Sequence, residues 1–193
     1  MAKKILLIQG HPDNESFCHA LHAAYRDGAR SAGAEVEEIF VAKLQFNPNL
    51  AHGYRERTEL EPDLLEAQRK IKNADHIVVI HPVWWGAAPA LLKGFFDRVL
   101  LPGFAFKKRP GSLFWDKYLT GKTGRLIATM DQPRWYYWLV YWAPSHRAIK
   151  NLTLEFCGIR PVGVTSIGPI RNSETAFREK WISKVKALGA NLR

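Results

Sequence analysis

Short, continuous apolar runs recur along the chain and alternate with longer segments of helical periodicity. The first run, Lys3-Lys4-Ile5-Leu6-Leu7-Ile8-Gln9, ends at Gly10. A run of this kind is typical of a strand buried on both faces of a parallel sheet. The pattern predicts five strands, over residues 3–9, 35–40, 74–80, 123–129 and 160–167. It predicts five helices, over residues 16–31, 62–73, 89–100, 144–156 and 173–188.

Strands that alternate with helices predict an α/β fold with an open, doubly wound parallel sheet. A parallel crossover needs about a dozen residues and is almost always right-handed, so helices should cover both faces. For five strands we expect the order 2-1-3-4-5 within one domain over residues 1–193. Two stretches without a clear period, 41–61 and 102–121, are predicted to be irregular.

In such sheets ligands bind beyond the carboxyl ends of the strands, at the switch point between strands one and three. That rule directs attention to three loops, over residues 9–17, 81–88 and 130–143. We expect a functional site where these loops meet.

The first of these loops, residues 10–17, runs from a strand directly into a helix. It offers unpaired amide groups at the positive end of the helix dipole, which is a favourable place for an anion. His11 and Asn14 add side-chain donors, and Ser16 adds a hydroxyl. Neither the Gly-x-Gly-x-x-Gly spacing nor a Walker lysine is present. The alternative is that Ser16 only caps the helix and that His11 is satisfied by the backbone.

The second loop, Pro82-Val83-Trp84-Trp85-Gly86-Ala87-Ala88, places two large aromatic residues directly after a buried strand. Their area needs a partner or a ligand with a flat face. The amides of residues 84–86 are suited to bind the polar edge of a planar heterocycle. Packing in the protein core is the alternative for an isolated tryptophan pair, but the loop lies opposite the first loop, and we favour the ligand.

The composition, with 47% hydrophobic and 24% charged residues in 193, is that of an ordinary globular protein. No apolar run reaches the roughly 18 residues of a membrane span, and the start is too short for a signal-peptide core. We therefore expect a cytoplasmic protein. Cys18 and Cys157 have no metal-ligand spacing, so we expect buried thiols and no metal site.

The excess of positive over negative charge is confined to the second half of the chain. Residues 1–103 hold 12 basic and 13 acidic residues, a net of −1, whereas residues 104–193 hold 16 basic and 5 acidic, a net of +11. Such a surface attracts anions. Among anionic partners we favour a phosphorylated cofactor over a membrane surface. We expect no binding of nucleic acid. A merely solvated basic face is equally compatible with these numbers.

Several motifs, in combination, resemble the NAD(P)H:quinone oxidoreductase branch, similar to DT-diaphorase, of the flavodoxin-like superfamily. The resemblance covers most of the chain. The motifs are His11-x-x-x-x-Ser16-Phe17, Phe46-Asn47-Pro48, the helix from Pro62 to Gln68, Pro82-Val83-Trp84-Trp85, the segment from Pro89 to Val99, Gly103-Phe104-Ala105-Phe106 and Phe156-Cys157-Gly158.

The resemblance implies a flavin enzyme that transfers hydride from NADH or NADPH to a quinone-like acceptor in a ping-pong cycle. It implies a homodimer with shared active sites and a bound flavin, with FAD favoured over FMN. The cofactor-binding residues that we expect from the loops and the resemblance together are His11, Asn14, Ser16, Phe17, Gln68, Pro82, Val83, Trp84, Trp85, Gly86, Thr129 and Asp131.

The sequence departs from the family after the fourth predicted strand. Where better-known members carry Thr-Thr-Gly-Gly, this chain reads Thr129-Met130-Asp131-Gln132, so a side chain such as Asp131 is expected to contact the flavin instead. Tyr137 falls at the family's catalytic tyrosine. His146 matches the family's catalytic histidine only if a three-residue insertion is allowed. Arg134 is an alternative source of the positive charge. The alternative for His146 is a helix residue exposed to solvent.

Residues 135–142 contain six aromatic side chains in eight positions. They fit a dimer core and the roof of an acceptor pocket equally well. Two other functions compete with the reductase: an electron carrier of the flavodoxin kind, disfavoured by the charge of +10, and an ancillary subunit of a membrane transporter.

Overall fold

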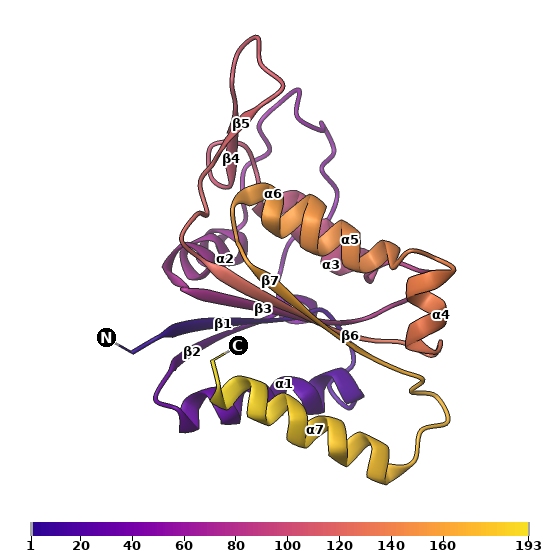
Figure 1. Ribbon diagram of the computed structural model, residues 1–193. Coiled ribbons are helices and arrows are strands. Elements are labelled where there is room, and N and C mark those ends of the chain that lie inside the picture. Colours follow the sequence, from indigo (N-terminus) through magenta and orange to yellow (C-terminus); the bar gives the residue numbers. More distant parts are fainter. Residues whose placement is uncertain (1, 193) are drawn as a thin grey trace.

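The computed structural model describes residues 2–192 and places a five-stranded parallel sheet at the centre of the molecule (Figure 1). Its strands are β1 (Lys4–Gln9), β2 (Glu35–Phe40), β3 (His76–Pro82), β6 (Thr123–Thr129) and β7 (Val162–Ile167). They lie in the order β2-β1-β3-β6-β7. This is the predicted 2-1-3-4-5 arrangement, and the predicted fold class is confirmed.

The middle of the sheet is apolar because both of its faces are covered. All seven residues of β3 are buried, and Leu6 of β1 pairs in register with Ile77 of β3. On the other side of β3, Val79 pairs with Leu126 of β6. Continuous burial explains why these strands could be predicted from uninterrupted apolar runs.

Helices α1 (Phe17–Ser31) and α7 (Thr175–Ala190) cover one face of the sheet. Helices α2 (Pro62–Asn73), α3 (Ala90–Val99) and α5 (Pro144–Ile149) cover the other. The backbones of α1 and α7 approach each other closely at two glycines. A Cβ at Gly28 would lie 2.0 Å from the Lys186 carbonyl oxygen, and one at Gly189 would lie 2.2 Å from that of Tyr25.

Two segments differ from the prediction, and one predicted helix is present as a continuous helical run of three parts. The irregular stretch 102–121 contains a two-stranded antiparallel hairpin, β4 (Phe106–Lys108) and β5 (Trp115–Lys117). The third loop contains a short helix, α4 (Arg134–Leu139). The helix predicted over 144–156 is α5, followed by a π-helical segment η2 (Lys150–Leu154) and the short α6 (Glu155–Cys157). A short 3-10 turn, η1 (Val41–Lys43), follows β2.

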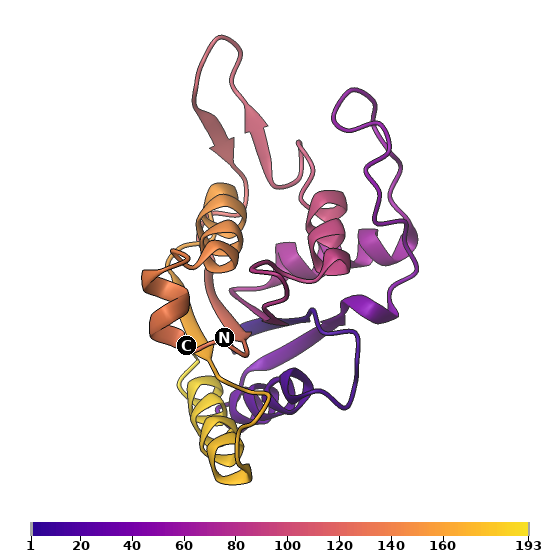
Figure 2. The ribbon, with the colours of Figure 1, turned by 90° about the vertical axis from the view of Figure 1, so that its right-hand side faces the viewer.

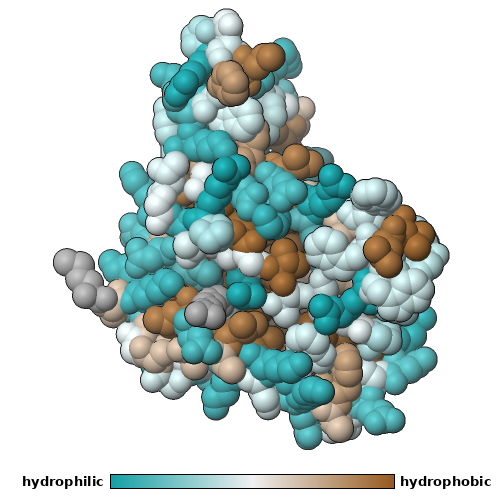
Figure 3. Space-filling model, in the orientation of Figure 1, coloured by the Kyte–Doolittle hydropathy of each residue, from teal (hydrophilic) through white to brown (hydrophobic). Residues whose placement is uncertain are grey.

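The hairpin and the 44–61 segment project from the same side of the molecule, as Figure 2 shows. Several exposed apolar side chains lie together at the end of this projection and around α4, and others are isolated, such as Leu65 on α2 and Leu152 on η2 (Figure 3). No helix in residues 2–192 is long and apolar enough to cross a bilayer. Cys18 and Cys157 are both buried and free, as predicted.

Candidate functional site

A cavity of about 180 Å³ opens at the carboxyl ends of β1, β3 and β6. All three loops singled out in the sequence contribute to it. Its lining residues are His11, Ser16, Phe17, Cys18, Pro82, Val83, Trp84, Thr129, Met130, Asp131 and Ile170. The fold therefore brings eight of the twelve predicted cofactor-binding residues together at one site.

His11 presents one ring nitrogen to this cavity as a hydrogen-bond donor. Its Nδ1 accepts a hydrogen bond from the Asp13 amide at 3.0 Å. In the neutral ring the proton is therefore on Nε2. Burial lowers the pKa of His11, with the nearby Asp13 acting in the opposite direction. A ligand oxygen beside Nε2 would receive this proton in a hydrogen bond.

Helix α1 begins at the edge of the same cavity. Ser16 caps it, because its Oγ accepts a hydrogen bond from the His19 amide at 3.3 Å and donates one to the Asp13 carbonyl at 2.8 Å. The amides of Phe17 and Cys18 precede the first intrahelical hydrogen bond and remain available to an anion. Asn14 is exposed in the same loop and does not line the cavity.

Two residues that the sequence analysis did not select hold this loop in place. The buried Gln9 donates from Nε2 to the Cys18 carbonyl at 3.0 Å and accepts the His11 amide at its Oε1 at 3.0 Å. The Cys18 Sγ lies 3.2 Å from Thr129 Oγ1, which ties α1 to β6. Burial raises the pKa of the Cys18 thiol to about 12, so it is an uncharged packing residue. A polar residue at the end of an apolar strand was the one available sequence signal for Gln9.

The tryptophan loop is a tight turn. Trp84 and Ala87 exchange two backbone hydrogen bonds of 2.9 Å, and Trp85 and Gly86 between them have φ angles of 50° and 76°. Two consecutive positive φ values are the mark of a type I′ turn. The Trp84 amide is thus used within the turn, which corrects the expectation that it is free for a ligand. Its ring lies 5.3 Å from the His11 ring, and the Trp85 side chain is fully exposed.

Tyr137 and His146 form a buried pair beside this cavity. Tyr137 packs against Met130 and Val83, two of the lining residues. Its hydroxyl donates to the Gly86 carbonyl at 3.3 Å and accepts the Ser145 amide at 2.9 Å. The hydroxyl therefore connects the tryptophan turn to the start of α5.

His146 is 1% exposed, so the alternative reading of a solvent-exposed helix residue is wrong. The sequence could not show that α5 turns this side chain onto Ser166 of β7, whose Oγ lies 2.8 Å from His146 Nε2. The other nitrogen, Nδ1, is buried with no partner among the described residues. An unpaired buried donor or acceptor of this kind is normally satisfied by water or a bound molecule.

Both members of the pair are uncharged at neutral pH, and burial extends the pH range over which they stay so. Burial raises the pKa of Tyr137 and lowers the pKa of His146 to about 4, an effect reinforced by the nearby His81. The fully buried His81 likewise has a pKa of about 4. The site thus holds a neutral phenol and neutral imidazoles next to a cavity that opens to solvent.

Asp131 lines the cavity but its carboxylate is already paired. One oxygen accepts the Arg171 amide at 3.0 Å, and the other lies 3.3 Å from the Arg171 guanidinium. This pair holds the turn that contains Ile170, another lining residue. Asp131 therefore shapes the cavity wall through Arg171.

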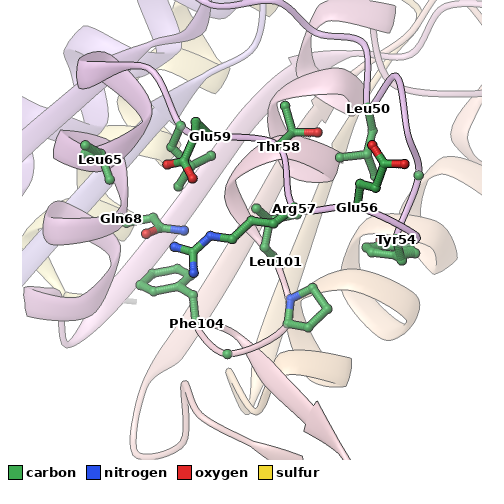
Figure 4. A pocket seen from close by; sticks show the side chains of 14 residues that line it. Leu50, Tyr54, Glu56, Arg57, Thr58, Glu59, Leu65, Gln68, Leu101 and Phe104 are labelled. Atoms are coloured by element: carbon green, nitrogen blue, oxygen red, sulfur yellow. The ribbon is translucent and has the colours of Figure 1, made fainter.

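Gln68, another predicted cofactor-binding residue, lies away from this cavity. Its Nε2 donates to the Val99 carbonyl at the end of α3, and it lines a second cavity of about 510 Å³. Figure 4 shows this cavity between the 50–60 segment, α2 and the residues that precede the hairpin, with Arg57 pointing toward Gln68 and Phe104. Gln68 therefore does not line the cavity at the carboxyl ends of the strands.

The chain belongs to the family of proteins with a flavodoxin-like fold, which it matches over residues 3–188. It is 25% identical to the ribosyldihydronicotinamide dehydrogenase (quinone) of Rattus norvegicus, over 96% of this chain and 92% of that protein. The predicted resemblance to the quinone oxidoreductase branch is confirmed.

Two solved structures share the fold. An NAD(P)H:quinone oxidoreductase from Methanothermobacter marburgensis superposes with a TM-score of 0.83 at 22% identity, over 100% of this chain and 98% of that chain. An FMN-dependent NADH-azoreductase from Bacillus anthracis, in complex with FMN, gives 0.77 at 18% identity, over 98% and 99%. At these identities the likeness establishes the fold alone.

Proposed function

We propose that this protein is a flavin-dependent NAD(P)H:quinone oxidoreductase that passes two electrons from NADH or NADPH to a quinone-like acceptor in a ping-pong cycle. The observation that carries the proposal is the buried, neutral Tyr137–His146 pair beside a cavity built from all three loops. An electron carrier has no use for a proton-holding pair at its cofactor, whereas a reductase does.

The residues present fit a flavin. Its phosphate end would bind the amides of Phe17 and Cys18 at the start of α1, with His11 Nε2 as a side-chain donor. Its planar ring would lie against Trp84, Val83 and the tryptophan turn, with Thr129 and Pro82 at the base of the cavity. The unpaired His146 Nδ1 is the kind of buried polar atom that such a ligand, or a water beside it, satisfies.

When bound, a flavin supplies hydride chemistry, accepting two electrons from the nicotinamide and delivering them to the acceptor. The chain supplies binding, orientation and protons. The Tyr137 hydroxyl is protonated at neutral pH and donates its proton to the Gly86 carbonyl in a long, 3.3 Å hydrogen bond. It could exchange this bond for one to negative charge that develops beside it. His146 stays neutral and holds the Tyr137 ring edge to face.

We propose that the flavin is FAD and that the protein is a homodimer. The proposal of FAD rests on Gln68 and on the long 41–61 segment, which line the second cavity together with Tyr54 and Phe104. The proposal of a homodimer rests on the family resemblance. Mass spectrometry of the released flavin, with light scattering of the holoprotein, tests both.

The surplus of basic residues after position 103 leads us to propose a preference for NADPH. Among the cationic residues near the site, Arg171 pairs with Asp131 and Lys150 with Glu155, which leaves Arg134 and Arg147 for the extra phosphate. Exposed charges are screened over about 8 Å at physiological salt, so we expect a preference of only a few-fold. The ratio of kcat/KM for the two donors should fall toward one as salt is added.

The test of the proposed function is turnover of NADPH with menadione by the flavin-loaded protein. Turnover excludes an electron carrier and a purely ancillary subunit, neither of which needs a donor site. We place the enzyme in the cytoplasm, where NAD(P)H is available.

A further inference from the structure

The short helix α4 and the turn after it display most of their large apolar side chains to solvent. Trp135 is 64% exposed, Leu139 72% and Trp142 70%, whereas Tyr137 faces inward. Figure 3 shows this region as brown side chains among pale aromatic rings at the right-hand edge of the molecule. We call Trp135, Leu139, Val140 and Trp142 the α4 edge. A contiguous exposed apolar surface of this kind marks an interaction site.

Backbone strain at the α4 edge maintains this exposure. Trp142 and Trp85 have φ angles of 60° and 50°, a left-handed conformation that is rare for bulky residues. The two turns also adjoin, because Gly86 accepts the Tyr137 hydroxyl and a Cβ on it would meet Pro144 at 3.7 Å. Two separate turns thus use an unfavourable conformation to place a tryptophan in solvent.

The segment that carries the α4 edge has a net positive charge. The 23 residues from 132 to 154 include three basic residues and no Asp or Glu. Lys150 pairs with Glu155, but Arg134 and Arg147 are exposed and have no carboxylate partner among the described residues. The flanking carboxylates of Asp131 and Glu155 are paired with Arg171 and Lys150, so an anionic surface would meet a net positive charge here.

We propose that the α4 edge docks on an anionic lipid bilayer. Tryptophan favours the headgroup level of a membrane, apolar side chains such as Leu139 and Val140 favour the acyl boundary, and the net positive charge of the segment would attract an anionic surface. Each basic residue near such a surface strengthens binding in a salt-dependent way. The docked protein is peripheral, since α4 is six residues long.

A second copy of this chain fits the other exposed surface better. The hairpin and the 44–61 segment expose Leu113, Phe114 and Tyr54 among charges of both signs, including the Arg109–Asp116 and Arg55–Glu56 pairs. The hairpin is basic, with four basic residues against Asp116, whereas the 44–61 segment beside it holds three acidic and two basic residues. The hairpin of one copy can therefore be complemented by the 44–61 segment of a second copy, whereas that acidic segment would be repelled by anionic lipid. We therefore assign self-association to the hairpin side.

The docking also bears on the acceptor, and this part rests on the proposed function. The α4 edge adjoins the Tyr137–His146 pair and the tryptophan turn. A quinone that leaves the bilayer at this edge would therefore emerge close to the cavity. Long-chain quinones in vesicles would then be reduced with a lower KM than the same headgroup without a tail.

The experiment measures binding without turnover, so its failure leaves the proposed function standing. Flavin-loaded protein is sedimented with vesicles of phosphatidylcholine alone or with a third of it replaced by phosphatidylglycerol. We expect pelleting with the anionic vesicles only, reduced by salt, with a blue shift in tryptophan emission. Trp135→Ser with Leu139→Asp should weaken the partition coefficient at least tenfold. The control variant Leu152→Ser removes an exposed apolar side chain from η2, outside both the α4 edge and the hairpin, and should leave the partition coefficient unchanged.

Circular dichroism and flavin content establish that both variants are folded. Failure of the wild type to pellet would overturn the proposal, as would equal pelleting on neutral vesicles or unchanged pelleting of the α4-edge variant. A fall from dimer to monomer mass in the α4-edge variant would identify this face as a contact between copies and would also overturn it.

Discussion

The ring of Tyr137 lies edge to face against the ring of His146, with 5.1 Å between their centroids. Three connections hold the pair in place: Tyr137 to the tryptophan turn through Gly86, Tyr137 to α5 through the Ser145 amide, and His146 to β7 through Ser166. The pair therefore joins the loop after β3 to the strand at the edge of the sheet. Its orientation is set by the fold before any ligand binds.

Replacing Tyr137 with Phe should lower kcat about 100-fold, the usual scale for losing a positioned proton donor. The ring remains, so packing against Met130 and His146 is preserved, and flavin content should stay near that of the wild type. The measurement is steady-state reduction of menadione by NADPH. Tyr136→Phe removes a neighbouring hydroxyl that interacts with Tyr141, and serves as the control. Equal kcat in the two variants would remove Tyr137 from the reaction.

Replacing Trp85 with Ala should weaken flavin binding. Stacked aromatic groups contribute about 0.5–1.5 kcal/mol beyond the area that they bury, which corresponds to roughly a two- to tenfold rise in Kd. The side chain is fully exposed in the protein alone, so the substitution leaves no cavity. Titration of apoprotein with FAD or FMN, followed by fluorescence quenching, measures the effect. Trp181→Ala on α7 is a control away from the turn. An unchanged Kd in Trp85→Ala would exclude this residue from the flavin site.

Replacing Gly189 with Ala should destabilise the protein by about 1–3 kcal/mol, because the new Cβ would lie 2.2 Å from the Tyr25 carbonyl oxygen of α1. Helix propensity alone predicts the opposite sign, a gain of up to about 1 kcal/mol. Urea unfolding therefore distinguishes packing from propensity. At the exposed position 187 of the same helix, Ala→Gly should cost about 1 kcal/mol. A stabilised Gly189→Ala variant would show that the two helices can separate at no cost.

Stability should fall as pH drops from about 6.5 to about 4. Burial lowers the pKa of His76, His81 and His146 to about 4 from the ordinary value of 6.5. Above pH 6.5 these rings are neutral in both states. Between the two values the unfolded chain takes up protons and the folded chain does not, so the free energy of unfolding decreases. Each histidine contributes as much as about 3 kcal/mol to this loss.

Urea unfolding at pH 7 and pH 5 tests this dependence. His76 lies at the amino end of β3, away from the cavity, and bonds Thr123 through Nδ1. His76→Gln should flatten the pH dependence, whereas substitution of the exposed His52 by Gln should not. A free energy of unfolding that is constant across this pH range would contradict burial of these rings in the neutral form.

The sheet could be predicted from the sequence because strands buried on both faces have continuous apolar runs, as in β1 and β3. The hairpin could not, since its strands have three residues each and its ends are exposed. Helix α4 was missed for a related reason: six aromatic residues in eight positions leave no apolar and polar alternation to reveal a period. The approach of His11, Trp84 and Thr129 followed from strand order. The burial of His146 and the separation of Gln68 depend on contacts between distant segments.

Oxidation of NADPH with menadione, measured with and without added flavin, tests the central claim most directly. We expect the purified protein to be yellow and to oxidise NADPH in the presence of menadione, to lose this activity when its flavin is removed, and to regain it when flavin is restored. Parallel lines in double-reciprocal plots would report the ping-pong cycle. A flavin-loaded protein that does not oxidise NADPH or NADH with menadione would contradict the account.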